Sequence, residues 1–183
     1  TLKPDEAQTV KIQAVRTAEL APGEYRSHLY FRATPKEKPL GEEVPEQQDP
    51  STISIKLVPV FGITIPVIVR VGNPTATVTL SDLALTFEND TLPRLSFVFI
   101  RSGDCSVYGD VTVDHIAPDG TVTGVGLARG VAVYTPNTRR KFSLNLTGGG
   151  SLDFSSGRLA VTFSAPSDVK PQKYAANELI LTR

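Results

Sequence analysis

The sequence predicts an all-β protein, and three observations favour this fold class. Apolar residues alternate with period two along the stretch Ile53–Arg70, as they do in strands with one buried face. After Thr75, short β-branched and aromatic runs are separated by turn residues about every 8–12 residues, which is the spacing of strands in a β-sandwich. No convincing amphipathic helical pattern and no repeat of solenoid length is present.

Two runs before the long stretch have the composition of strands, and one segment has that of a loop. Strands are expected at Gln8–Val15, which alternates loosely, and at Tyr25–Ala33, which is rich in aromatic and apolar residues. The sequence APGE at Ala21–Glu24 is a turn between them. Pro35–Pro50 contains four prolines and five acidic residues, so it is expected to be a mobile loop that forms no core.

The stretch Ile53–Arg70 combines a continuous apolar row with unusual length. All its odd positions are apolar, whereas its even positions mix polar and apolar residues. At about 3.3 Å per residue it could reach ~55 Å, more than a small sandwich pairs within one sheet. Part of it is therefore expected to be an exposed edge that offers an apolar row and free backbone groups to another chain.

Two prolines and one glycine leave an alternative open for this stretch. Pro59 and Pro66 each remove a backbone donor, so each is expected on a sheet edge, at a bulge or at a bend. The stretch could also be two consecutive buried strands with a kink near Phe61-Gly62. Periodicity does not decide between these two interpretations.

The remainder of the chain is predicted to form short strands connected by turns. The phase of the apolar positions changes near Ser81-Asp82, which indicates a bulge. A tight turn is expected at Pro118-Asp119-Gly120, and Ser155-Ser156-Gly157 is expected to connect a hairpin. The predicted strands are Ala76–Phe87, Leu95–Arg101, Val107–His115, Thr121–Ala128, Val131–Tyr134, Phe142–Leu146, Leu152–Phe154, Leu159–Phe163 and Ala175–Leu181.

Composition argues against several classes of partner. The 19 basic and 19 acidic residues give a formal net charge of zero, so no global field would attract nucleic acid or an anionic membrane. No apolar run reaches the length of a transmembrane helix. The chain contains no methionine, and we therefore expect that residues precede Thr1 in the full-length protein.

The residues with reactive side chains do not form a recognisable catalytic or metal site. His28 and His115 are isolated in the sequence, and the acidic residues lack metal-ligand spacing. Cys105 is the single cysteine, so it cannot form an internal disulfide and is expected to be a small free thiol. We therefore predict no catalytic residue, no bound metal and no cofactor.

The order of segments along the chain matches that of a known family. LKPDEAQTVKI resembles a proline-containing turn followed by a strand, and LAPGEYRSHLYFRATP resembles the next strand. A long polar loop then precedes a long alternating strand that ends in Arg70, and Asn73-Pro74 opens a second domain. In that domain GDCSVYGDVTV and GVAVYTPNTRRKFSLNL resemble a divergent branch. This order, over nearly the whole chain, resembles the periplasmic pilus (fimbrial) assembly chaperones.

The resemblance implies two immunoglobulin-like β-sandwich domains, of which the first lacks its N-terminal strands. The first would span residues 1–72, with a polar loop at 35–52 and a long donor-type strand at 53–70. The second would span residues 73–183. A sandwich that lacks strands has bare edges, so self-association through exposed strand edges is also expected.

The resemblance further implies a function in the periplasm. Such chaperones lend a strand to a pilus or surface-fibre subunit whose own sandwich lacks one, and then deliver the subunit to an outer-membrane usher. No nucleic acid and no transmembrane segment would be involved. The donor residues would be Ile53, Ile55, Leu57, Pro59 and Phe61.

The family also anchors the C-terminal carboxylate of the subunit with basic residues. One of them is a lysine four residues before the terminal arginine of the long strand, where this chain has Pro66. Lys56 and Arg70 are the basic residues of the long strand that could contact the subunit instead.

Two other functions are compatible with the sequence. The chain could be a structural or adhesive two-sandwich surface protein, in which the long strand is an ordinary core element. It could also be an accessory domain of an enzyme whose catalytic part lies elsewhere. The prediction is therefore a non-enzymatic chaperone, with the surface protein as its main alternative.

Overall fold

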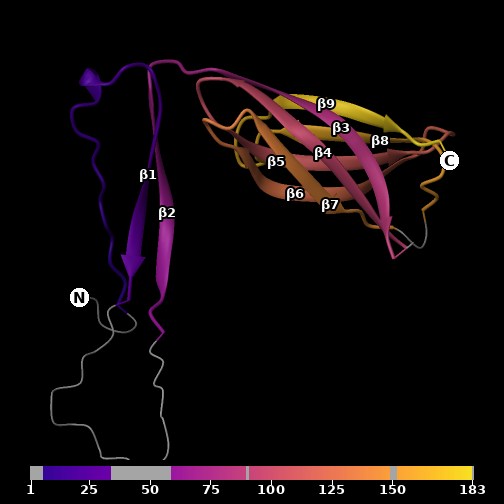
Figure 1. The fold of residues 1–183 in the computed structure, drawn as a ribbon, viewed down its shortest axis with the longest axis horizontal. Coiled ribbons are helices and arrows are strands. Elements are labelled where there is room, and N and C mark those ends of the chain that lie inside the picture. The colour runs from indigo at the N-terminus through magenta and orange to yellow at the C-terminus, as the bar shows by residue number, and fades with distance from the viewer. Residues whose placement is uncertain (1–5, 34–58, 90, 149–151, 183) are drawn as a thin grey trace, which may run out of the picture. The chain divides into compact units, whose positions relative to one another are not determined.

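The computed structural model describes residues 6–33, 59–89, 91–148 and 152–182 of the 183-residue chain, and the fold is all-β (Figure 1). The chain divides into two compact units. Unit 1 contains Thr1–Glu24 and Arg70–Arg183, and unit 2 contains Tyr25–Val69. Within the described ranges the helical structure is one short 3₁₀ turn, Thr17–Glu19, and no helix is long and apolar enough to cross a membrane.

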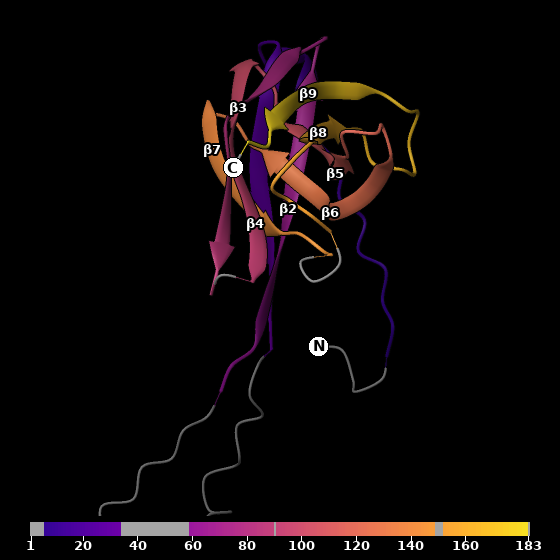
Figure 2. The same ribbon diagram turned by 90° about the vertical axis from the view of Figure 1, so that its right-hand side faces the viewer.

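Unit 1 is a β-sandwich of two antiparallel sheets, which Figures 1 and 2 show as two packed layers. One sheet has the strand order β3-β4-β7, and the other has the order β6-β5-β8-β9. The strands are β3 (Ala76–Glu88), β4 (Leu92–Gly103), β5 (Val107–Ile116), β6 (Val122–Val133), β7 (Arg139–Asn145), β8 (Arg158–Ser164) and β9 (Lys173–Ile180).

The core of the sandwich is made by alternate apolar residues on the facing sides of the two sheets. Leu95, Phe97 and Phe99 on β4 are buried, as are Leu159 and Phe163 on β8. The rings of Phe99 and Phe163 meet edge to face, with their centroids 5.0 Å apart, a geometry that adds to the free energy gained from burial. Aromatic residues from both sheets therefore join the two layers.

Unit 2 is a β-hairpin formed by most of β1 (Gly23–Arg32) and β2 (Gly62–Val71), which pair as a two-stranded sheet. The β-branched residues of β2 suit an extended backbone. The loop predicted at Pro35–Pro50 lies outside the described residues. Of the predicted strand Ile53–Arg70, residues 53–58 also lie outside them, Pro59–Phe61 belong to no strand, and the remainder forms β2.

Several sequence predictions are confirmed. Strands occupy the regions predicted at Tyr25–Ala33 and at most positions after Thr75. The predicted bulge is present, because the β3–β4 register shifts between Ser81 and Ala84 and Asp82 has a φ of 54°. The predicted turn before β6 is closed by a 2.9 Å hydrogen bond from Gly120 N to Ala117 O. The immunoglobulin-like layout and the domain boundary at residues 72–73 remain predictions.

Two predicted strands were wrong because their alternating residues find no partner strand. Residues 8–15 form no strand, and Val10, Ile12 and Val15 are all exposed. Leu152–Phe154 also forms no strand; instead, Phe154 is buried in the core. The hairpin expected around Ser155-Ser156-Gly157 is therefore absent, and β8 pairs with β5 and β9.

Two strands predicted as separate are one strand. The predicted strands Thr121–Ala128 and Val131–Tyr134 belong to β6, which continues through a register shift opposite Asp110. Gly130 has a φ of 71°, a conformation that glycine adopts without strain. Its N–H donates a 3.0 Å hydrogen bond to the Asp110 carboxylate, so the bulge is stabilised and the strand is not broken.

We predict that Gly109→Ala destabilises the sandwich by about 1–3 kcal/mol. A Cβ at Gly109 would lie 2.0 Å from Ser164 O and 3.0 Å from the Phe163 ring, so β5 and β8 would have to separate. The matched control is Gly124→Ala, where the nearest atom to the new Cβ is Asp114 Oδ1 at 3.6 Å. Urea unfolding measures both variants, and equal stability of the two would contradict the steric argument.

Candidate functional site

The first candidate site is an apolar row formed by Phe61, which directly precedes β2, and by Ile63, Ile65, Val67 and Val69 on β2. Two contacts define how β2 pairs with β1. Ala33 N donates a 2.8 Å hydrogen bond to Phe61 O, and Arg70 Nε lies 3.1 Å from Glu24 Oε2. These contacts are nine residues apart on both sides of the hairpin, so a single antiparallel register without an inserted residue connects them.

This register determines which backbone groups of β2 remain free. Since Phe61 O accepts from Ala33, the N–H and C=O groups of odd-numbered residues point toward β1. The backbone groups of even-numbered residues, including Thr64 and Ile68, therefore point to the opposite edge. Among the described residues no strand pairs with that edge. The backbone nitrogen of Pro66, which carries no hydrogen, lies on the same free edge, as predicted for a strand proline. The β1–β2 ladder therefore loses no hydrogen bond.

The same register places the apolar row on one face of the hairpin together with apolar residues of β1. Leu29 and Phe31 face Ile65 and Ile63 across the strands, whereas His28 and Pro66 share the opposite face. The row is most exposed at its beginning. Phe61 is 74% exposed, Ile63 67% and Ile65 47%, whereas Val67 and Val69 are half-buried.

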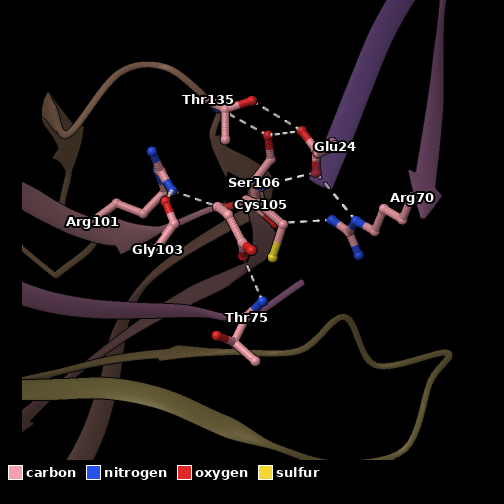
Figure 3. Close-up of polar contacts among 9 residues, drawn as sticks. Glu24, Arg70, Thr75, Arg101, Gly103, Cys105, Ser106 and Thr135 are labelled. Carbon is pink, nitrogen blue, oxygen red and sulfur yellow. Dashed lines mark hydrogen bonds and ion pairs between the residues drawn. The ribbon is translucent and has the colours of Figure 1, made fainter. Parts of the chain in front are cut away.

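The second candidate site is a polar cluster in unit 1 around the carboxylate of Glu24 (Figure 3). The Glu24 side chain is fully buried. It accepts hydrogen bonds from the backbone N–H of Ser106 at 2.9 Å, from the Ser106 hydroxyl, from Thr135 Oγ1 at 3.2 Å and from Arg70 Nε at 3.1 Å. Arg70 also donates through Nη2 to Ser106 O at 2.9 Å. The cluster therefore links the ends of β1 and β2 to the segment before β5 and to Thr135.

These contacts set the charge state of Glu24. Burial on its own would raise the pKa of the carboxyl group, but the two hydrogen bonds from Ser106 and the guanidinium of Arg70 outweigh it and lower the pKa below its ordinary value of 4.5. Glu24 is therefore ionised at neutral pH, and its charge is matched by that of Arg70.

The chain next to this cluster is held by Arg101, which is buried. Its guanidinium donates to three backbone oxygens, those of Asn137 at 3.0 Å, Gly103 at 2.8 Å and Cys105 at 2.9 Å. On the other side, Asp104 Oδ1 accepts a 2.6 Å hydrogen bond from Thr75 N. These bonds fix the turn from which Ser106 reaches Glu24 (Figure 3).

Cys105 is a buried free thiol, as predicted. Burial raises the pKa of the thiol, and the nearby charge of Arg70 offsets this only in part. The thiol is therefore protonated at neutral pH, which makes it a poor nucleophile.

A cavity of about 540 Å³ lies beside Arg70 and Cys105 in unit 1. Its lining carries two cationic side chains, Arg70 and Lys173, and one acidic side chain, Asp168. Within the described ranges, no group of three or more His, Cys, Asp or Glu side chains could hold a metal ion. His115, which lies on β5 of the sandwich, is buried, and its Nε2 lies 3.1 Å from Ser156 O.

The predicted site residues fall into three groups. Ile53, Ile55, Lys56 and Leu57 lie outside the described residues. Pro59 and Phe61 are exposed and precede β2. Arg70, predicted as a basic contact, belongs to the Glu24 cluster. The roles predicted for all of these residues remain predictions.

Sequence reasoning missed Glu24 as a functional candidate. Glu24 follows Pro22-Gly23 at the start of β1 and resembles an ordinary solvated residue in the sequence. The one available signal was its position opposite Arg70 in a hairpin, and that position requires a register that the sequence does not supply.

Comparisons with known proteins identify no family. No family model matches the chain, and no curated protein matches it. Among solved structures, the chain is similar to DesR, a β-glucosidase from Streptomyces venezuelae in complex with D-glucose, with 11% identity and a TM-score of 0.38 over 58% of this chain and 15% of that one. It is also similar to β-glucosidase 3B from Thermotoga neapolitana in complex with glycerol, with 16% identity and a TM-score of 0.38 over 59% and 16%. At these TM-scores neither similarity carries an argument about fold or function.

We predict that Glu24→Gln lowers the free energy of unfolding by about 1–3 kcal/mol at pH 7, because an amide replaces a carboxylate that accepts four hydrogen bonds. The pKa of Glu24 is lowered in the folded state, so its contribution is complete above pH 4.5 and is lost as the pH falls through the folded-state pKa. The difference between wild type and variant should therefore narrow in urea unfolding at pH 3.

Asp82→Asn is the matched control for this measurement. Asp82 pairs with Arg139 at 3.7 Å, and both side chains are 66% exposed, so its removal should change the stability by less than about 1 kcal/mol. A Glu24→Gln difference that is the same at pH 7 and pH 3 would contradict the assigned role of the carboxylate.

Proposed function

We propose that this chain is a non-enzymatic chaperone that binds subunits of bacterial pili or surface fibres in the periplasm and delivers them to an outer-membrane usher. It stabilises a subunit by donating the strand that contains β2, which completes the incomplete sandwich of the subunit. The observation that carries this proposal is the exposed apolar row on β2, beside an edge with which no strand of the described residues pairs.

The exposure of the row is a reason to expect a partner. An isolated two-stranded sheet is marginally stable in water, and its apolar face gains free energy when another surface covers it. Phe61, Ile63 and Ile65 are each about half exposed or more. Burial of each of these side chains would contribute about 1.5–3 kcal/mol. Part of that gain is offset by the entropy that the two partners lose when they associate.

The free edge of β2 supports the same function. Addition of a strand to a sheet edge uses backbone hydrogen bonds for affinity and alternate side chains for specificity. β2 offers both features, because its even-numbered backbone groups and its odd-numbered apolar side chains are available together. This combination favours a partner that is itself a sheet with a missing strand.

The finer layout belongs to this proposal too. The two immunoglobulin-like domains, residues 1–72 and 73–183, and the donor residues Ile53, Ile55 and Leu57 follow from the resemblance to pilus chaperones in the order of segments. The sandwich of unit 1 is compatible with the proposed second domain.

We predict that the double variant Ile63→Asp/Ile65→Asp loses subunit capture by at least about 100-fold, because two charges replace apolar side chains that the partner would bury. The measurement is affinity capture from periplasmic extract with the full chain as bait, followed by mass spectrometry. The supporting result is a secreted subunit that lacks a sandwich strand, is retained by wild type and is folded only in the complex.

His28→Asp is the matched control, since His28 is exposed on the opposite face of the same hairpin and should retain capture. Urea unfolding of the sandwich should be unchanged in both variants, because its core contains none of the described residues of unit 2, 25–33 and 59–69. A well-folded wild-type protein that retains no incomplete sandwich would contradict the chaperone and favour the structural or adhesive surface protein.

A further inference from the structure

Pro66 divides the free edge of β2 into two parts with different pairing ability. Before it, Gly62 and Thr64 each offer an N–H and a C=O to the free edge. At Pro66 the edge has a carbonyl but no donor, and the ring occupies the place where the N–H would be. Donors resume at Ile68. A partner strand that runs past Pro66 would therefore have a carbonyl without a partner in the middle of its ladder.

The exposure of the apolar row changes at the same place. Phe61, Ile63 and Ile65, which precede Pro66, are exposed, whereas Val67 and Val69, which follow it, are half-buried. The exposed part of the apolar row therefore ends where the run of backbone donors on the free edge is interrupted. Backbone chemistry and side-chain burial are separate observations, and both indicate the same limit.

We infer that the strand of a bound partner pairs with β2 at Gly62 and Thr64 and ends before Pro66, so that Pro66 sets the register of the complex. This inference rests on the proposed function, and it specifies which part of β2 the subunit uses. The partner segment is an extended strand with apolar side chains at alternate positions, on the face that it shares with Phe61, Ile63 and Ile65.

The register of the hairpin supplies a direct test, because proline at an even position removes a donor from the free edge and none from the β1 ladder. Thr64→Pro removes a donor that the inferred complex uses. Ile68→Pro removes one that it does not use. Pro66→Val restores a backbone donor at position 66 and would allow the hydrogen bonds between β2 and the partner strand to continue past it.

The experiment uses the purified complex of the full chain with the subunit captured by wild type, and it measures the rate at which the subunit is released. Thr64→Pro should release the subunit about tenfold faster or more, whereas Ile68→Pro should change the rate by less than about twofold. Pro66→Val should slow release by about threefold to tenfold, as expected for one added hydrogen bond. Pro118→Val, in the exposed turn before β6, controls for the loss of a proline elsewhere.

Hydrogen exchange of the same complexes confirms that each variant keeps its hairpin. The amides of Ile63 and Ile65 point toward β1 and should remain protected in every variant, whereas the amide of Thr64 should be protected in wild type only when the subunit is bound. The amide of Ile68 should exchange freely in the wild-type complex.

Two results would overturn the inference, and they are distinguishable. Protection of the Ile68 amide in the wild-type complex, together with fast release from Ile68→Pro, would mean that the partner pairs with β2 beyond Pro66. The proposed chaperone function would then be retained, but the inference that pairing ends before Pro66 would be wrong. Absence of any captured subunit from wild type would remove the chaperone function, and the inference with it.

Discussion

The hydrogen bonds and the ion pair of the buried Glu24 carboxylate hold the ends of β1 and β2 next to the segment before β5. A carboxylate without solvent is costly unless donors surround it. Here the donors come from three distant parts of the sequence, Arg70, Ser106 and Thr135. Each donor must be in place for the charge to be tolerated, so the ends of β1 and β2, the start of β5 and the segment after β6 are fixed together. Arg101 and Asp104 extend this constraint, because their hydrogen bonds hold the turn that presents Ser106.

The ion pair between Glu24 and Arg70 has a second consequence, which concerns the hairpin. Together with the hydrogen bond from Ala33 to Phe61, it determines whether the odd-numbered or the even-numbered residues of β2 direct their backbone groups toward β1. Odd residues direct their backbone groups to β1 and their side chains to the apolar face, and even residues direct their backbone groups to the free edge. A shift by one residue would turn the apolar row to the other face and place the missing donor of Pro66 within the β1 ladder. Pro66 is therefore compatible only with the register in which the even-numbered residues of β2 direct their backbone groups to the free edge.

The sequence predicted the all-β class, most strands of the sandwich and the bulge at Ser81-Asp82, because these depend on local periodicity and turn chemistry. It failed where the outcome depends on a distant neighbour. Val10, Ile12 and Ala14 alternate like a strand but lack a pairing partner within the described residues, and Phe154 fills the core from a loop. β6 continues through Gly130 because Asp110, on another strand, accepts its N–H. The apolar row was recognisable in the sequence, whereas Glu24 was not, since its role arises from donors far away in the chain.

The structure separates the residues that stabilise the sandwich from those proposed to bind a partner. The core of unit 1 is made by residues of β3–β9 and their connections, and no residue of unit 2 that the structure describes contributes to it. The exposed apolar side chains of β2 therefore have no part in the stability of the sandwich, and their exposure has to be explained by something other than packing within it. Scattered apolar residues on a surface need no explanation, but a row at alternate positions of one strand, next to free backbone groups, has the pattern of a sheet that is completed by another strand. The proposed function rests on that pattern, and Pro66 interrupts the donors of the free edge at the place where the row becomes half-buried.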